Sequence, residues 1–210
     1  MIERKENIKM KKICTICTVL ALTMLTACSN GDEADTTAAT TQATTVNEET
    51  TTKAEKKEYE TLEEKDITSV GDLDSVYEAE DYKISLLKGW NQQESNGADL
   101  FTFEDKEVRI GITSSTLEKS GTLDECIDNL CMLYENFDYT ITGIRDITIN
   151  GLKGRVIEYK SEGDDSSSTG YQMVVNGVKT MFVITFVADT ELYDGYVNQA
   201  NDIISTFVEK

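Results

Sequence analysis

Two Asn-Gly pairs set between runs of β-branched and aromatic residues constrain the fold of this chain more than any other feature. They are Asn150-Gly151 and Asn176-Gly177. Asparagine and glycine tolerate the positive φ angles that a two-residue hairpin turn requires. The sequence therefore predicts two antiparallel hairpins with such turns. The four predicted strands are residues 140–149, 152–160, 171–175 and 179–187.

The last of these strands is predicted to lie in the middle of a sheet. Successive side chains of a strand point to opposite faces, and here both faces are mainly apolar. Phe182, Ile184 and Phe186 share one face, and Met181, Val183, Thr185 and Val187 share the other. Three further strands are predicted at residues 81–87, 100–103 and 108–113, with a polar reversal at 104–107.

Two segments have helical instead of strand periodicity. Thr122 and Glu125 have the spacing of a capping box, and Asp189 or Thr190 can cap the last segment. Each segment has one apolar stripe and one polar face, as in helices packed on a sheet. The stripes are Leu123, Cys126, Ile127, Leu130, Cys131, Tyr134 and Phe137, then Tyr193, Tyr196, Val197, Ala200, Ile203, Ile204 and Phe207. We therefore predict an α+β domain, an antiparallel sheet flanked by two helices.

Only the part of the chain from residue 66 to residue 210 is rich enough in apolar residues to build this domain. Residues 29–65 consist mainly of Thr, Ala, Glu, Asp and Lys, a composition that cannot bury a core. We interpret residues 28–65 as a lipidated cysteine followed by a disordered Thr/Glu-rich tether. A flexible coil of this length spans roughly 30–36 Å.

Residues 1–27 have the features of a bacterial export signal. A basic segment at 1–12 precedes an uncharged, mostly apolar run at 13–27, which is shorter than the roughly twenty residues of a membrane-spanning helix. The run ends Leu25-Thr26-Ala27-Cys28. This tetrapeptide resembles the lipobox of bacterial lipoproteins, which implies cleavage between Ala27 and Cys28 and lipid on Cys28. The alternative is an ordinary signal peptide in which Cys28 is incidental.

The charge of the chain excludes nucleic acid as a partner. The formal charge is −19, with 39 acidic and 20 basic residues. Removing residues 1–27 takes away a net charge of +3, which leaves −22. Such a domain repels anionic lipid headgroups, so we expect it to meet the membrane only through lipid on Cys28, at the extracytoplasmic face.

Several segments together resemble the PsbP/Mog1/DcrB-like superfamily. They are the run Tyr82-Lys83-Ile84-Ser85-Leu86-Leu87-Lys88-Gly89-Trp90, the run Ile149-Asn150-Gly151-Leu152-Lys153-Gly154-Arg155 leading to Tyr159, and a last helix ending Ser205-Thr206-Phe207. The order of these elements carries the resemblance over residues 75–210. Related sequences usually place a proline shortly before the Gly-Trp pair, and this chain has none. The resemblance implies an α-β-α sandwich and mostly non-catalytic binding or assembly roles.

The chain offers little catalytic chemistry. It has no histidine, so Ser-His and Cys-His nucleophile pairs and histidine-containing zinc sites cannot form. Ser85 and Lys88 have Ser-x-x-Lys spacing but lie at a strand end, where they point to opposite faces. Cys126 and Cys131 on one helix would be about 7.5 Å apart along its axis, too far for a disulfide, so we interpret them as core residues. We expect no cofactor, no metal site and no enzymatic activity.

Two features are candidates for ligand contact. The loop at 161–169 is rich in oxygen ligands, and Asp164 and Asp165 in it could contact a cation or a partner. A solvated hairpin loop is the alternative. Trp90 could form a platform for a ligand, with core packing as the alternative.

The leading functional hypothesis is a lipid-anchored, extracytoplasmic, non-catalytic protein that binds a protein or cell-wall component of the bacterial envelope. The first alternative is a small-molecule or ion-binding accessory lipoprotein of a transport system. An enzyme that uses carboxylates comes third.

Overall fold

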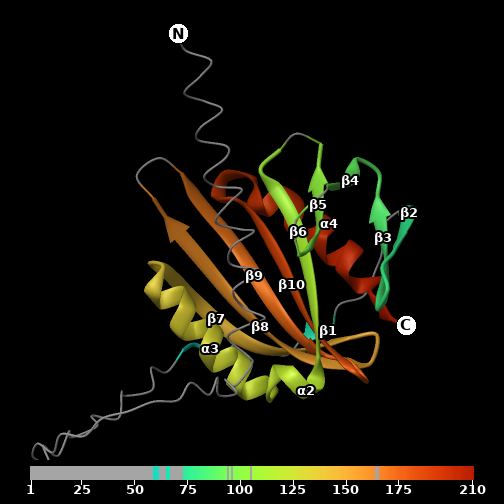
Figure 1. Cartoon of the computed structure of the whole chain (residues 1–210). Coiled ribbons are helices and arrows are strands. Elements are labelled where there is room, and N and C mark those ends of the chain that lie inside the picture. The colour runs from blue at the N-terminus through green and yellow to red at the C-terminus, as the bar shows by residue number, and fades with distance from the viewer. Residues whose placement is uncertain are drawn as a thin grey trace, which may run out of the picture.

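The computed structural model describes residues 59–61, 65–66, 73–93, 95, 97–104, 106–163 and 166–210. Figure 1 shows them as an α+β arrangement of sheets and helices, as predicted. The elements are β1 (Lys65–Asp66), β2 (Leu73–Glu78), β3 (Tyr82–Leu87), β4 (Trp90–Gln93), β5 (Asp99–Phe103), β6 (Val108–Thr116), α2 (Leu117–Ser120), α3 (Leu123–Asn136), β7 (Tyr139–Ile149), β8 (Leu152–Glu162), β9 (Ser167–Asn176), β10 (Thr180–Asp189), α4 (Thr190–Ser205) and β11 (Val208–Glu209).

The strands form one large sheet and one small sheet. The large sheet has the order β1-β7-β8-β9-β10-β6-β5-β4, and the small sheet has the order β11-β3-β2. All pairs are antiparallel except β1 with β7, which is parallel. The sequence pattern did not predict β1, β2, β4, β11 or the short helix α2.

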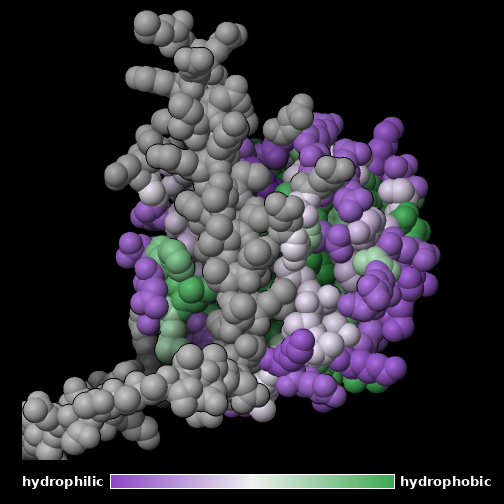
Figure 2. All heavy atoms as spheres, in the orientation of Figure 1, coloured by the Kyte–Doolittle hydropathy of each residue, from purple (hydrophilic) through white to green (hydrophobic). Residues whose placement is uncertain are grey.

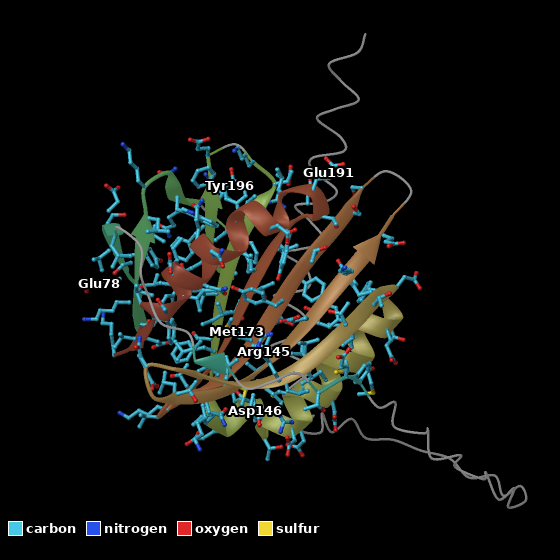
Figure 3. The ribbon with its side chains drawn as sticks, turned by 180° about the vertical axis from the view of Figure 1, so that it is seen from behind. Glu78, Arg145, Asp146, Met173, Glu191 and Tyr196 are labelled. Atoms are coloured by element: carbon cyan, nitrogen blue, oxygen red, sulfur yellow. The ribbon has the colours of Figure 1, made fainter. Side chains whose placement is uncertain are left out.

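The two faces of the large sheet support two separate cores, with α4 on one face and α3 on the other (Figures 1 and 3). The alternation in β10 divides its side chains between them. Phe182, Ile184 and Phe186 lie in the α4-side core, and Met181 and Val183 lie in the α3-side core. Since β10 pairs with β6 and β9, the prediction of a central strand is confirmed.

Both predicted hairpins are present, but one of the two predicted turns is wrong. Asn150 and Gly151 have φ angles of 48° and 84° and join β7 to β8. Asn176 and Gly177 have no positive φ, and residues 177–179 join β9 to β10. The second turn is closed by the Gly177 amide, which donates to the Thr180 carbonyl at 2.9 Å, and its Val178 and Lys179 amides donate to the distant Glu209 carboxylate.

Both predicted helices are confirmed. At the start of α3, the Thr122 hydroxyl accepts from the Glu125 amide at 3.3 Å, and the Glu125 carboxylate accepts from the Thr122 amide at 2.8 Å. These bonds satisfy amides that the helix itself cannot. Helix α4 has Asp189 as its N-cap residue, without a side-chain hydrogen bond.

A segment on the N-terminal side of the predicted domain boundary lies along the edge of β7. Thr61 forms a parallel bridge with Ile144, and Lys65 and Asp66 of β1 continue alongside the same strand. Tyr59 packs against the α3-side core. Contacts with the domain therefore begin at least as early as Tyr59, and the division at residue 66 stays a prediction. Residues 1–58, which hold the predicted signal and most of the tether, lie outside the described residues.

Candidate functional site

The α4 side of the large sheet is covered unevenly. Helix α4 packs on β10, β9 and β6 and on β3 of the small sheet. Figure 3 shows this side, where β8 and β7 extend beyond the helix. The side chains at this border are therefore held by a rigid sheet and still reach solvent.

An ion pair between neighbouring strands lies at this border. Arg145 of β7 donates from Nη1 to the carboxylate of Glu158 on β8. The hairpin register places Arg145 opposite Val156 and Gly143 opposite Glu158, so the two charged side chains are diagonal neighbours on one face. Their side chains are 15% and 27% exposed, which shields the pair from solvent more than an ordinary surface pair.

The rest of the guanidinium is incompletely satisfied. Arg145 Nε is buried and has no hydrogen-bond partner among the described residues. A buried donor without a partner costs about 1–3 kcal/mol, and such groups in native proteins call for an explanation.

Two tyrosines and an asparagine complete the cluster. Tyr171 of β9 is fully buried and donates from its hydroxyl to Asn201 of α4 at 2.7 Å. Burial, and then the Glu158 carboxylate, raise the pKa of Tyr193 to about 12, while Arg145 opposes the shift. Burial likewise raises the pKa of Tyr171. We call Arg145, Glu158, Tyr171, Tyr193 and Asn201 the Arg145 cluster.

The Arg145 cluster is suited to recognition by hydrogen bonding. It combines a guanidinium with five donors, a carboxylate that accepts, and a Tyr193 phenol that stays protonated at neutral pH. A half-buried position strengthens each of these hydrogen bonds relative to water. The cluster can bind a polar group that offers both acceptors and donors.

The predicted site residues are not gathered at this cluster. Cys28, Ala27, Asp164 and Asp165 lie outside the described residues. Trp90 is 3% exposed in the α4-side core, where its ring meets Phe103 edge-on and its indole N–H donates to Gln199 at 3.2 Å. This placement gives Trp90 the packing role, and contact of its ring with a ligand has no support in the geometry.

The two thiols of the domain lie in the α3-side core. Cys126 and Cys131 are buried on α3 and are not joined in a disulfide. The Cys126 thiol contacts the Ser120 carbonyl at 2.9 Å and Met181 Sδ at 3.4 Å. Within the described residues, no group of three or more Asp, Glu, Cys or His side chains is arranged to hold a metal ion.

Figure 2 shows the α3 side of the molecule, where the coloured residues are mainly hydrophilic with smaller areas of hydrophobic colour between them. Exposed large apolar side chains include Leu73 and Val76 of β2 and Met132 of α3. No helix in the described part of the chain has the length and apolar character needed to cross a membrane.

The fold agrees with that of solved structures that share little sequence with this chain. CyanoP, the PsbP protein of Synechocystis sp. PCC 6803, is 13% identical and aligns with a TM-score of 0.51 over 65% of this chain and 92% of its own. LpqN of Mycobacterium tuberculosis, involved in cell envelope biogenesis, is 14% identical with a TM-score of 0.52 over 67% and 87%. The domain has a PsbP/Mog1-like fold.

The similarity extends at lower score to the Ran-binding protein Mog1p of Saccharomyces cerevisiae, at 9% identity and a TM-score of 0.44 over 65% of this chain and 96% of that one. No protein-family model matches the chain, and no curated protein matches its sequence. The PsbP/Mog1-like assignment therefore rests on the arrangement of the elements.

The Arg145 cluster was not predicted, although the sequence allows Arg145 and Glu158 to be placed on one face of the sheet. Counting outward from the Asn150-Gly151 turn places Arg145 opposite Val156 and on the same face as Glu158. That register signals a cross-strand ion pair. Tyr193 and Asn201 give no comparable signal, because their approach depends on how α4 packs on the sheet.

Proposed function

We propose that the chain is a bacterial lipoprotein whose PsbP/Mog1-like domain binds a component of the cell envelope without catalysing a reaction. Residues 1–27 direct export, Cys28 carries the lipid, and the domain works at the extracytoplasmic face of the membrane. The lipobox at residues 25–28 supports the anchor. The fold shared with LpqN, a protein involved in cell envelope biogenesis, supports the cellular setting.

The Arg145 cluster is the observation that carries the binding role. It holds a partly buried ion pair and a buried guanidinium N–H that has no hydrogen-bond partner among the described residues, at the border of the sheet face on which α4 packs. A bound group that accepted a hydrogen bond from this N–H would remove the cost of leaving the donor without a partner. Because the chain has no histidine, the chemistry at this border favours recognition over nucleophilic catalysis. No contact in the described residues specifically favours an ion-binding accessory role.

The lipid anchor is tested by metabolic labelling. Cells that express the full chain are grown with radiolabelled palmitate, alongside Cys28→Ala and the matched variant Cys17→Ala. We expect label in the parent and in Cys17→Ala and none in Cys28→Ala. Label that persists in Cys28→Ala would refute the anchor.

The binding role is tested with purified peptidoglycan sacculi. The full chain in detergent is sedimented with sacculi, alongside Arg145→Gln and the matched variant Arg155→Gln. Arg155 bonds to Asp124 and Asp146 on the α3 side of the sheet, so it controls for loss of an arginine. We expect Arg145→Gln to reduce retention about tenfold, as for a residue central to an interface. Equal retention of the two variants would exclude the Arg145 cluster as the wall-binding site.

A further inference from the structure

The small sheet has one face on the core and one face turned outward. Helix α4 packs on β3, and the buried residues of β3 lie in the α4-side core. They are Tyr82, Ile84 and Leu86. Successive side chains of a strand point to opposite faces, so the residues between them, which begin with Lys83, point away from α4. Lys83 is exposed, as expected for this outward face.

Apolar side chains gather on the outward face of the small sheet. Leu73 and Val76 of β2 lie opposite outward-facing residues of β3, and so does Val208 of β11. Opposite residues of paired strands share a face. Val76 is 63% exposed, Leu73 48% and Val208 38%. Exposed apolar side chains that share one surface mark interaction sites more often than scattered ones do. We call Leu73, Val76 and Val208 the outer apolar patch.

The strand that carries two residues of this patch is also the end strand of its sheet. The order is β11-β3-β2, and no described strand pairs with the other edge of β2. Figure 1 shows β2 at the margin of the molecule beside β3. In such a strand, alternate residues direct their amides and carbonyls away from the neighbouring strand. With six residues, β2 is long enough to pair with an added strand.

β2 carries two features that protect a strand edge. The register with β3 shifts between Leu73 and Ser75, which is a bulge, and Asp74 and Glu78 add carboxylates to a strand that has no basic residue. Figure 3 labels Glu78 at the margin of the molecule. Charges on an edge strand hinder pairing with other chains. This protection is selective, because carboxylates repel an acidic strand and attract a basic one.

The carboxylates make a second copy of this chain a poor occupant of the edge. Antiparallel pairing of two β2 strands centred on Val76 would set Asp74 of one copy opposite Glu78 of the other. Parallel pairing in register would set each carboxylate beside its own counterpart. Like charges directly opposite each other destabilise a strand pair. The formal charge of −19 also keeps copies of the chain apart.

A basic strand fits the same edge. Residues opposite each other on neighbouring strands are about 4.5–5.5 Å apart, whereas residues two strands away are about 10 Å apart. An added strand would therefore meet Asp74 and Glu78 directly and would meet Lys83 of β3 only at the longer distance. Lys210 balances part of the Glu78 charge, with Nζ 3.8 Å from the carboxylate. Among the described residues, Asp74 has no ion-pair partner.

We propose that β2 and the outer apolar patch form a docking site for an extended segment of a protein partner, in which an apolar residue stands between two basic residues. The segment adds a strand to the free edge of β2. Its basic residues face Asp74 and Glu78, and its apolar residue lies beside Val76. The site shares no residue with the Arg145 cluster, and the inference does not depend on the lipid anchor or on wall binding.

The test uses the full chain in detergent and two fluorescein-labelled peptides. One is Thr-Lys-Thr-Ile-Thr-Lys-Thr, whose symmetry suits either strand direction, and the other has glutamate in place of lysine. The variant is Asp74→Lys with Glu78→Lys. The matched control is Glu118→Lys with Glu162→Lys, which makes the same change of charge at exposed positions on α2 and β8. Fluorescence anisotropy measures affinity, and hydrogen exchange measures protection of the β2 amides.

We expect the lysine peptide to bind the parent and the control variant alike. It should bind the Asp74→Lys, Glu78→Lys variant about tenfold more weakly, since two attractive cross-strand pairs become repulsive. That variant should prefer the glutamate peptide. The lysine peptide should slow exchange of the β2 amides in the parent, because strand addition pairs them. Val76→Ser, at an exposed position, should weaken binding severalfold without lowering the midpoint of thermal unfolding.

Three results would overturn the proposal. Absence of lysine-peptide binding to the parent at millimolar concentration would exclude the site. Equal affinity of the parent for both peptides would show that the carboxylates do not select the partner. Binding without protection of the β2 amides would place the peptide elsewhere on the molecule. None of these results bears on retention by sacculi, which tests the Arg145 cluster separately.

Discussion

The two hairpin turns share the same dipeptide and are held by different means. Asn150 and Gly151 both adopt positive φ angles, so the turn between β7 and β8 is set by local conformation. In the turn between β9 and β10, the amides of Val178 and Lys179 donate to the Glu209 carboxylate at 2.6 and 3.2 Å. That turn therefore combines a local bond, from the Gly177 amide to the Thr180 carbonyl, with a side chain about thirty residues away in sequence.

The two glycines differ in their role: Gly151 allows a backbone conformation, and Gly177 leaves room for a neighbouring side chain. Gly151 has φ +84°, and a Cβ there would meet nothing within 4 Å. Gly177 has no positive φ, but a Cβ there would lie 2.5 Å from the Glu209 carboxylate. Glycine is therefore favoured at the two positions for unrelated physical reasons, and at position 177 the atoms that a Cβ would meet belong to the movable end of the Glu209 side chain.

Both turns nevertheless bind the same part of the chain. The Asn150 side-chain amide donates to the carbonyls of Ser205 and Phe207, both at 2.8 Å, while Glu209 reaches the other turn. The C-terminal segment thus lies between the two turns and is bonded to each of them.

The largest expected effect comes from Asn150→Ala. The change removes two hydrogen bonds to carbonyls and places alanine at φ 48°, so we expect a loss of about 2–4 kcal/mol. Urea unfolding followed by Trp90 fluorescence measures it as a lower midpoint. The matched control is Asn176→Ala, whose Oδ1 is buried without a partner and whose φ is not positive. Equal losses in the two variants would show that the turns do not differ in this way.

A smaller effect is expected from Gly151→Ala. A Cβ at position 151 would meet no atom within 4 Å, so the cost of the change comes from the backbone, where alanine must adopt φ +84°. The left-handed conformation costs an alanine about 1–2 kcal/mol. The midpoint of thermal unfolding should fall accordingly. A further Glu209→Ala change should add its own cost independently, because the two sites share no contact. Strong coupling between them would contradict a purely local turn.

The smallest effect is expected from the pair Gly177→Ala and Glu209→Ala. Each disrupts the carboxylate contact with an exposed turn, so each should cost about 0.5–1.5 kcal/mol. The double variant should cost clearly less than the two single losses combined, since Gly177→Ala has nothing to displace once the carboxylate is absent. Urea unfolding of all four chains completes the cycle. Additive losses would mean that Gly177 does not act through Glu209.

The same contrast explains how much of the fold the sequence could reveal. The long strands β7, β8 and β10 were predictable because alternation and turn residues are local signals. β2 has five exposed residues out of six, and β4 has three exposed polar residues after Trp90, so neither shows a buried face. The pairing of β11 with β3 joins Val208 to Lys83, which no local pattern encodes.

The candidate site was likewise predictable only in part. The Arg145 and Glu158 pair follows from the register of a predictable hairpin. The contribution of Tyr193 follows only from the position of α4. Local chemistry could indicate the ion pair, whereas the neighbours that complete the cluster depend on tertiary packing.

The position of the C-terminal segment has a consequence for protein synthesis. The Ser85 amide donates to Thr206 Oγ1, 121 positions later, and the Lys210 amide donates to the Asp81 carbonyl. A ribosome makes the chain from its N-terminus, so Thr206 and Lys210 emerge after the residues that they bind. The contacts of both hairpin turns with this segment, and the pairing of β11 in the small sheet, therefore form only after residues 205–209 have been synthesised. A chain that stops six residues early would lack β11 and the carboxylate that holds the second turn.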